Sequence, residues 1–206
     1  SELNDNKNNL GLNSEAIRLI QKYYTDFIRS GAKLSSKEKE QLKSINGKIA
    51  VLQTNFSQNI LKEVNALAVV VNSREELDGL NDTSIEAAAN EANSRGLEGK
   101  YVIALKNTSS QPVMASLKNR ALREKIHKTS LSRGSNGSEF DNREILSKVI
   151  KLRAERAQLM GYSNHASYRL ESQTAQTPEA VNERLTSLAP KALINAKEEA
   201  SDFFTF

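Results

Sequence analysis

The chain has 206 residues, of which 26% are charged and 38% are hydrophobic, and it contains 9 glycines and 3 prolines. Because Ala, Leu, Glu, Lys and Arg favour helices and helix breakers are scarce, this composition predicts a mainly α protein. The chain has no cysteine, which excludes disulfides and thiolate metal sites and is typical of a reducing compartment. The longest apolar run, residues 66–71, is far shorter than the roughly 20 residues of a membrane helix. We therefore predict a cytoplasmic protein with no membrane partner.

The charge pattern argues against nucleic acid as a partner. The formal net charge is +4, but the 29 basic and 25 acidic residues are interleaved along the predicted helices. Pairs such as Glu144 and Lys148, one helical turn apart, are typical of solvated helix faces. No stretch combines clustered basic residues with interleaved aromatic residues, as nucleic-acid grooves do. Nucleic-acid binding is therefore the weaker alternative, and salt-sensitive binding would be its test.

Residues 1–13 are polar and rich in asparagine, and we interpret them as a linker or loop. Residues 14–65 predict a long helical hairpin. Apolar residues recur at helical spacing in two runs, first Ile17, Ile20, Tyr24, Phe27 and Ile28, then Leu42, Ile45, Ile49, Leu52, Phe56 and Ile60. Gly31 predicts the end of the first helix, and a capping box of Ser35 and Glu38 predicts the start of the second. Since the connection is short, the two helices are expected to pack antiparallel.

Residues 66–106 change period and predict a small β/α insert. Two short apolar runs, ALAVVV at 66–71 and YVIAL at 101–105, predict strands that pair with each other. Between them, a capping box of Thr83 and Glu86 and a stop at Gly96 predict a short helix. The connection is long enough for either parallel or antiparallel pairing, so the sequence leaves both open.

Residues 112–206 predict a helical region. The stretch ASLKNRALREKIHKTSLSRG predicts one helix that ends at Gly134. A further helix is expected from Asp141 and Glu144 to Met160, followed by a stop at Gly161.

The stretch LMGYSNHASYRLESQTAQTPEAV predicts a joint between helices. Ser163 predicts the start of a short helix, and Thr177 and Pro178 predict the cap and first turn of the last one, which Pro190 is expected to kink. The apolar positions of this last helix continue into SDFFTF without a Gly, Asn or Pro stop. We therefore interpret the chain as an internal piece of a longer protein. An exposed apolar face on this helix would favour self-association.

The two histidines do not match a catalytic zinc motif. A helical site of the H-E-x-x-H type needs two histidines four residues apart, with glutamate after the first. His127 has Leu131 four residues later and His165 has Arg169, and neither histidine is followed by glutamate. We interpret His127 as a surface or ion-paired residue and His165 as part of a structural joint. The sequence thus predicts no metal ligand and no catalytic residue in this chain.

Other candidate motifs are equally weak. RGLEGK at 95–100 lacks the spacing and the Ser or Thr of a phosphate-binding loop. The adjacent glutamates at 75–76 and 198–199 diverge by about 100° around a helix and do not converge on one ligand. No serine has histidine and carboxylate partners that the sequence alone identifies. The substrate-binding residues are therefore unknown from the sequence.

Several stretches together resemble one family. LRAERAQLMGYSNHASYRLESQTAQTPEAV is similar to the L-R-A-x-x-A-x-L-L-G-Y-x-x-x-A-x-Y-x-L-x-x-x-x-A-x-T-P stretch of the thimet oligopeptidase, oligopeptidase A and peptidyl-dipeptidase family of zinc metallopeptidases. NRALREKIHKTSLSRG, EFDNREILSKVIKLRAER, RGLEGKYVIALKNTSSQPVMA and NFSQNILKEVNALAVVV resemble the same family in the same order. The likeness covers residues 14–200 and is nearest to the bacterial peptidyl-dipeptidase (dipeptidyl carboxypeptidase) branch.

The resemblance implies a mainly α fold of the neurolysin and thimet oligopeptidase type, with helical hairpins and a bundle beside one short two-stranded β element. It also implies a longer parent protein that encloses a deep channel and binds zinc through an H-E-x-x-H helix and a downstream glutamate. That motif is missing here, so zinc is the implied cofactor of the parent and no cofactor is implied for this chain. Residues 14–206 would then form the helical wall and cap of the channel.

The implied function is that of a non-catalytic helical portion of a peptidase that releases C-terminal dipeptides from oligopeptides. The implied partners are the remainder of the peptidase chain and, for the parent, an oligopeptide substrate, and a periplasmic location is open for the parent. The alternative is a free-standing helical module that binds a protein partner. The end of the last helix discriminates the two, because a free-standing module should complete it with a cap.

Overall fold

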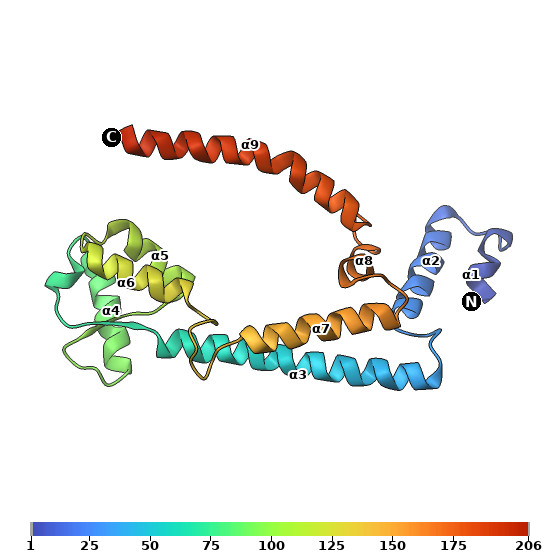
Figure 1. Cartoon of the computed structure of the whole chain (residues 1–206), viewed down its shortest axis with the longest axis horizontal. Helices are drawn as coiled ribbons and strands as arrows, with labels where there is room; N and C mark the ends of the chain where they lie inside the picture. The colour runs from blue at the N-terminus through green and yellow to red at the C-terminus, as the bar shows by residue number, and fades with distance from the viewer. Residues whose placement is uncertain (1, 206) are drawn as a thin grey trace. The chain divides into compact units, whose positions relative to one another are not determined.

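A computed structural model describes the backbone of residues 2–205 and the side chains of residues 2–106 and 112–205. Figure 1 shows the elements, which in chain order are α1 (Glu2–Asp5), η1 (Lys7–Asn9), α2 (Ser14–Arg29), α3 (Ser36–Ala66), β1 (Val69–Val71), η2 (Glu75–Leu77), α4 (Asp82–Ser94), β2 (Tyr101–Ile103), α5 (Asn107–Ser116), α6 (Arg120–Leu131), α7 (Arg143–Leu159), α8 (His165–Leu170) and α9 (Pro178–Thr205). Helices hold 69% of the residues, so the predicted mainly α fold with one two-stranded β element is confirmed.

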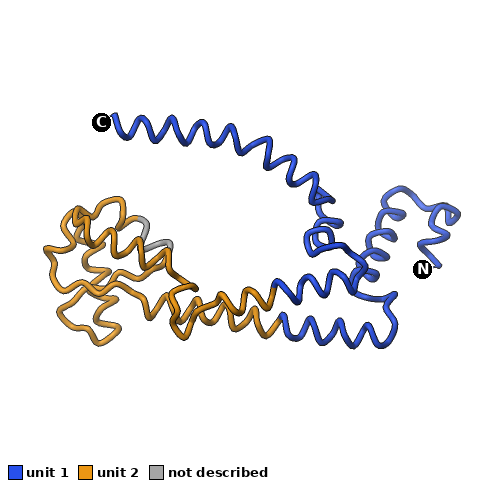
Figure 2. The backbone as a smooth tube through the Cα atoms, viewed as in Figure 1, with its two compact units in different colours: residues 1–49, 150–206 blue, residues 50–149 orange. Residues whose placement is uncertain are grey.

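The chain divides into two compact units, which Figure 2 distinguishes by colour. Unit 1 comprises Ser1–Ile49 and Ile150–Phe206, and unit 2 comprises Ala50–Val149. The boundaries fall inside α3 and α7, so each of these helices contributes residues to both units. The subdivision predicted from the sequence, with boundaries at residues 13, 65, 106 and 112, stays a prediction.

The sheet of unit 2 is antiparallel, which settles the alternative that the sequence left open. The register places Val69 opposite Ile103, Val70 opposite Val102 and Val71 opposite Tyr101. The predicted short helix, α4, connects the two strands and packs against β2. The strands are shorter than the predicted apolar runs, because the pairing includes only three residues of each.

The core of unit 2 gathers apolar side chains from both strands and from the segments that cover them. Its buried members are Val69, Val71, Leu77, Ile85, Ile103, Leu105, Leu117, Leu122 and Ile126. In β1, Val69 and Val71 are buried while Val70 between them is half-buried, as expected for a strand whose side chains alternate between two faces. The two apolar runs that predicted strands therefore supply Val69, Val71, Ile103 and Leu105 to this core, and the other five residues come from the segments that cover the strands.

The start of α4 differs from the prediction. The helix begins at Asp82, and the side chain of Asn81 accepts a hydrogen bond from the Ser84 amide at 2.9 Å. The capping box predicted at Thr83 is therefore wrong. Asn81 already satisfies one of the free amides of the first turn, so the helix starts earlier in the chain.

The single helix predicted for residues 115–134 is divided in two. α5 ends at Ser116, and Leu117 adopts an extended conformation with φ of −63° and ψ of 124°. Asn119 then caps α6 by accepting a hydrogen bond from the Leu122 amide at 3.1 Å. The break lets Leu117 point into the core, where its side chain is buried. Helical propensity alone gave no sign of this interruption.

A buried carboxylate connects α3 to the loop before α7 within unit 2. Glu63 is 1% exposed, and its Oε2 accepts a hydrogen bond from the amide of Gly134. Asn142 extends the connection, because its amide nitrogen Nδ2 donates to the carbonyl of Phe56 and its Oδ1 accepts from Asn59, both at 3.1 Å. Because the side chains of Glu63 and Asn142 are buried, their hydrogen bonds are not exchanged for bonds to water, and they hold the loop in one conformation.

The helices α2 and α3 of unit 1 begin as predicted. Ser35 and Glu38 form the expected capping box, with Glu38 Oε2 accepting from the Ser35 amide at 2.8 Å and Ser35 Oγ accepting from the Glu38 amide at 3.3 Å. Residues 2–9, interpreted as linker or loop, contain α1 and η1. The antiparallel packing predicted for α2 and α3 stays a prediction, since the side-chain hydrogen bonds described in this unit join α2 to α8 and α3 to α7.

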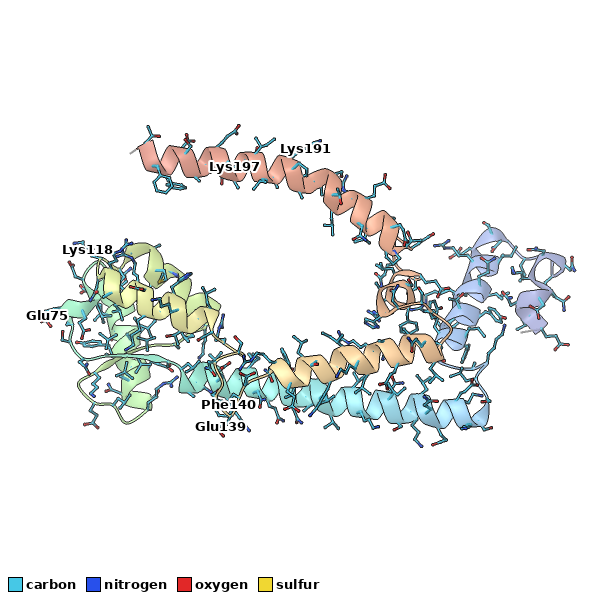
Figure 3. All side chains as sticks on the ribbon, viewed as in Figure 1. Glu75, Lys118, Glu139, Phe140, Lys191 and Lys197 are labelled. Atoms are coloured by element: carbon cyan, nitrogen blue, oxygen red, sulfur yellow. The ribbon has the colours of Figure 1, made fainter. Side chains whose placement is uncertain are left out.

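The last helix, α9, starts at the predicted cap. Thr177 Oγ1 accepts a hydrogen bond from the Ala180 amide at 3.1 Å, and the helix then continues through Pro190 with a curved axis (Figure 1). Lys191 and Lys197 extend from it in Figure 3. Its large apolar side chains are exposed, and they are Leu185, Leu188, Leu193, Ile194, Phe203 and Phe204. No helix among residues 2–205 has the length and apolar character needed to span a bilayer.

The core of unit 2 can be tested with two matched substitutions in α6. Leu122→Ala should lower the free energy of unfolding by about 2–5 kcal/mol, because it leaves a cavity where a side chain is only 6% exposed. Leu131→Ala, the same change at a position that is 71% exposed, should cost less than about 0.5 kcal/mol. Urea unfolding followed by circular dichroism measures both. Equal losses in the two variants would contradict this assignment of the core.

Candidate functional site

The structure places the two histidines in different units. His127 lies in α6 of unit 2 and is exposed, as predicted for a surface residue. His165 is the first residue of α8 in unit 1 and is half-buried. Its Nδ1 atom is buried and has no hydrogen-bond partner among the described residues. His165 therefore lies just after the turn between α7 and α8 with a buried ring nitrogen that no described side chain pairs.

The described residues do not fit a catalytic zinc ion. Such an ion needs three protein ligands and an open position for water. Among the side chains that the structure describes, no three His, Asp or Glu residues come together to form such a group.

Four residues of unit 1 contact one another through polar groups and aromatic rings. They are Arg29, Tyr162, Tyr168 and Glu171, and we call them the Arg29 cluster. Arg29 is the last residue of α2, and its guanidinium carbon lies 4.6 Å from the ring centre of Tyr168 and 5.9 Å from that of Tyr162. The two rings meet edge to face, with centres 5.2 Å apart and planes at 71°. These distances are typical of cation–π and aromatic contacts.

Hydrogen bonds link the four members of the Arg29 cluster. The Arg29 guanidinium donates to the backbone carbonyl of Tyr168 and to Oε2 of Glu171, and the hydroxyl of Tyr162 donates to the same oxygen. In return, the hydroxyl of Tyr168 donates to the carbonyl of Arg29 at 3.2 Å. That carbonyl belongs to the last turn of α2, where acceptors lack partners within the helix. The cluster therefore fixes the end of α2 to α8.

The turn between α7 and α8 positions the two tyrosines. Gly161 adopts a φ of 83°, and the amide of Tyr162 donates to the carbonyl of Ala157 at 2.9 Å, which ends α7 as predicted. Asn164, and not Ser163 as predicted, starts α8, because its side chain accepts from the amide of Ser167 at 2.9 Å. The turn thus places one tyrosine just before the short helix and the other inside it.

The cluster shifts two pKa values in opposite directions. The hydrogen bond from Tyr162 is the largest cause that lowers the pKa of Glu171, and Arg29 adds to it, while burial opposes both. Burial is the largest cause that raises the pKa of Tyr162, and the Glu171 carboxylate adds to it. Glu171 is therefore held as a carboxylate and Tyr162 as a neutral hydroxyl donor.

A second set of basic side chains surrounds His165, and we call Arg153, Arg156, Arg169 and His165 the basic group. The guanidinium carbon of Arg156 lies 5.4 Å from the ring centre of Tyr168, and the ring of His165 lies 6.3 Å from the same centre. Burial is the largest cause that lowers the pKa of His165, followed by the charges of Arg153, Arg156 and Arg169. His165 is thus favoured in its neutral form.

Sequence reasoning singled out His165 but missed the residues that surround it. Tyr162, Tyr168 and Glu171 all lie in the stretch LMGYSNHASYRLESQTAQTPEAV, so the sequence itself indicates that these three residues are close together. Nothing in the sequence places Arg29 beside them, because it lies 142 residues before Glu171. Among the other motifs, the side chain of Glu76 accepts hydrogen bonds from the amides of residues 72 and 73, which makes it part of a local turn.

The comparisons with known proteins concern most of the chain. The profile of peptidase family M3 matches residues 113–203, which hold three of the four members of the Arg29 cluster. The dipeptidyl carboxypeptidase of Escherichia coli strain K12 is 34% identical over 94% of this chain, and that of Salmonella typhimurium strain LT2 is 32% identical over 90%. Oligopeptidase A of Escherichia coli strain K12 is 29% identical over the full chain.

The chain fits peptidase family M3. M3 peptidases are generally zinc-dependent. The chain spans 28%, 27% and 31% of the lengths of these three relatives, respectively. The Arg29 cluster joins the segment that matches the M3 profile to α2, which precedes it in the chain.

The contribution of Arg29 can be tested by a substitution that keeps its charge. Arg29→Lys should lower the free energy of unfolding of unit 1 by about 1–3 kcal/mol, because lysine lacks the planar fork that reaches Glu171 and the Tyr168 carbonyl together. Arg18→Lys, at an exposed position of the same helix, is the control and should leave stability within about 0.5 kcal/mol. Urea unfolding measures both, and equal effects would refute a special role of Arg29.

The lowered pKa of Glu171 predicts a pH dependence. Its stabilisation should be fully present above the ordinary pKa of glutamate, about 4.3, and should be lost as the pH falls through the lower pKa of the folded state. The difference in unfolding free energy between the wild type and Glu171→Gln should therefore be constant above about pH 5 and shrink in more acid solution. Glu155→Gln, an exposed position of α7, serves as the control. A difference that does not change with pH would rule out this account of Glu171.

Proposed function

We propose that this chain is the helical, non-catalytic portion of an M3 peptidase that releases C-terminal dipeptides from oligopeptides. The observation that carries the proposal is the 34% identity with a dipeptidyl carboxypeptidase over 94% of this chain. Two of the relatives bear that name, and both are more similar to the chain than the oligopeptidase A of Escherichia coli, at 29%. This order supports dipeptide release over general oligopeptide cleavage.

The proposed role of these residues is to form the wall and cap of the peptidase channel. In this proposal the zinc ligands lie in parts of the peptidase that the chain does not cover, since its described side chains do not fit a zinc ion. The Arg29 cluster supports a scaffold role, because its hydrogen bonds fix one helix to another and leave none of its four members as a free nucleophile.

The remainder of the peptidase is the partner that we propose for α9. Leu188, Leu193 and Phe204 are between 44% and 92% exposed, which is typical of a helix whose apolar face packs against another segment. Self-association through α9 and the binding of a protein partner by a free-standing module would use the same side chains. A cytoplasmic location is also part of the proposal, and the name of an Arabidopsis thaliana relative, probable cytosolic oligopeptidase A, supports it.

The division between scaffold and chemistry can be tested with the chain and with a chimera. The purified chain should retain no stoichiometric zinc after dialysis and should not cleave a blocked peptide. A chimera in which it replaces the matching 28% of the Escherichia coli dipeptidyl carboxypeptidase should release dipeptides in a chelator-sensitive reaction. The same relative with that segment deleted is the control and should be inactive.

Two results would contradict this proposal. One tightly held zinc per chain, or chelator-sensitive hydrolysis by the 206 residues alone, would place the active site within them. A folded, zinc-loaded chimera that cleaves oligopeptides internally and releases no dipeptide would instead argue for an activity like that of oligopeptidase A.

A further inference from the structure

The basic group of unit 1 has positive charge without a matching carboxylate. Arg153 and Arg156 lie one turn apart on α7, and His165 and Arg169 lie one turn apart on α8. Among the described residues, none of the three arginines forms an ion pair. The carboxylate of the neighbouring Glu171 is already bound by Arg29 and Tyr162.

Two buried polar atoms of this group also lack partners. These atoms are Nε of Arg156 and Nδ1 of His165, and neither meets a hydrogen-bond acceptor or donor among the described residues. Arg156 is held in place, because its Nη1 donates to Oδ1 of Asn46 at 3.1 Å. Buried polar groups are normally paired, so a positioned guanidinium with a free Nε indicates a missing acceptor.

The Arg29 cluster shows which acceptor suits such an arrangement. The guanidinium groups of Arg29 and Arg156 both lie beside the ring of Tyr168, at 4.6 and 5.4 Å from its centre. Arg29 has a carboxylate partner in Glu171, whereas Arg156 has only the neutral side chain of Asn46. A carboxylate offers two coplanar oxygens to the planar donors of a guanidinium, which makes the pair stronger than a neutral one.

We propose that Arg153, Arg156 and His165 bind a carboxylate group of a peptide, as Arg29 and Tyr162 bind that of Glu171. Arg153 and Arg156 supply the positive charge, and the neutral imidazole of His165 donates a hydrogen bond to the carboxylate in the tautomer that carries its proton on Nδ1. The ligand class rests on the proposed function, since a peptidase that acts at C-termini meets free peptide carboxylates. The carboxylate can come from a C-terminus or from an Asp or Glu side chain, and the chemistry at the site is the same.

Nuclear magnetic resonance of the histidine rings tests the proposal on the chain itself. The chain has two histidines, so His165→Gln assigns both ring signals, and the exposed His127 of unit 2 is an internal control. N-acetyl-alanyl-alanine, with its free carboxylate, should shift the His165 signals in a saturable way and leave those of His127 unchanged. Its C-terminal amide should shift neither. An amide with aspartate in place of the first alanine tests side-chain carboxylates.

Substitutions then locate the binding groups. Arg156→Gln should raise the dissociation constant about tenfold, since it removes one charge-assisted pair. Arg153→Gln should weaken binding as well and serves as the second variant if Arg156→Gln does not fold. Arg184→Gln, at an exposed position of α9 in the same unit, is the matched control and should leave binding unchanged.

Several outcomes would overturn the proposal. These are the absence of a saturable shift with either carboxylate peptide, an equal shift with the peptide amide, and equal weakening in Arg184→Gln. Equally tight binding of inorganic phosphate would also overturn it, because the site would then accept anions in general. The measurement requires neither zinc nor cleavage, so its failure is distinct from a failure of the proposed peptidase role.

Discussion

The guanidinium group of Arg29 is the contact on which the arrangement of unit 1 depends most. It lies beside two tyrosine rings, donates to a backbone carbonyl of α8 and binds the carboxylate of Glu171. The side chain of Arg29 is only 11% exposed, so the loss of any of these partners would leave a charged group poorly solvated. No residue of α2 is buried, so the described attachment of α2 to α8 rests on this polar contact.

The two units bury apolar residues to different extents. Unit 2 has a core of apolar residues around its two strands, with Glu63 and Asn142 holding the adjacent loop through buried hydrogen bonds. Unit 1 buries fewer apolar residues, which are Leu42, Ile45, Ile49 and Ala157, and it joins α2 to α8 through the polar Arg29 cluster, while its last helix exposes apolar side chains. Such an asymmetry fits a segment that shares its packing with further parts of an M3 peptidase, which is the role we propose.

The sequence predicts local features well and distant contacts poorly. The caps at Ser35 and Thr177 and the stop at Gly161 were predicted because each depends on residues within one or two turns. The start of α4 was misplaced because Thr83 and Glu86 also match a capping box, and the start of α6 was missed because helical propensity gives no sign of the break before it. The cluster was missed as a whole, because no periodic pattern links Arg29 to a carboxylate 142 residues away.

The same reasoning explains why His165 was given a structural role while its neighbours were not recognised. Its lack of a zinc motif could be read from the sequence, but the three arginines around it come from two helices and have no common spacing. Their effect on the pKa of His165 depends on the turn at Gly161, which sets α8 against α7. The chemistry of the basic group is therefore a property of the fold and not of a motif.

A double-mutant cycle between Arg29 and Glu171 tests the central claim most directly. Urea unfolding of Arg29→Lys, Glu171→Gln and the double variant gives the coupling free energy between the two side chains. If their ion pair fixes α2 to the segment after α8, the coupling should be at least about 0.5 kcal/mol at neutral pH and should disappear in acid. Additive effects of the two substitutions at neutral pH would show that the contact does not hold unit 1 together.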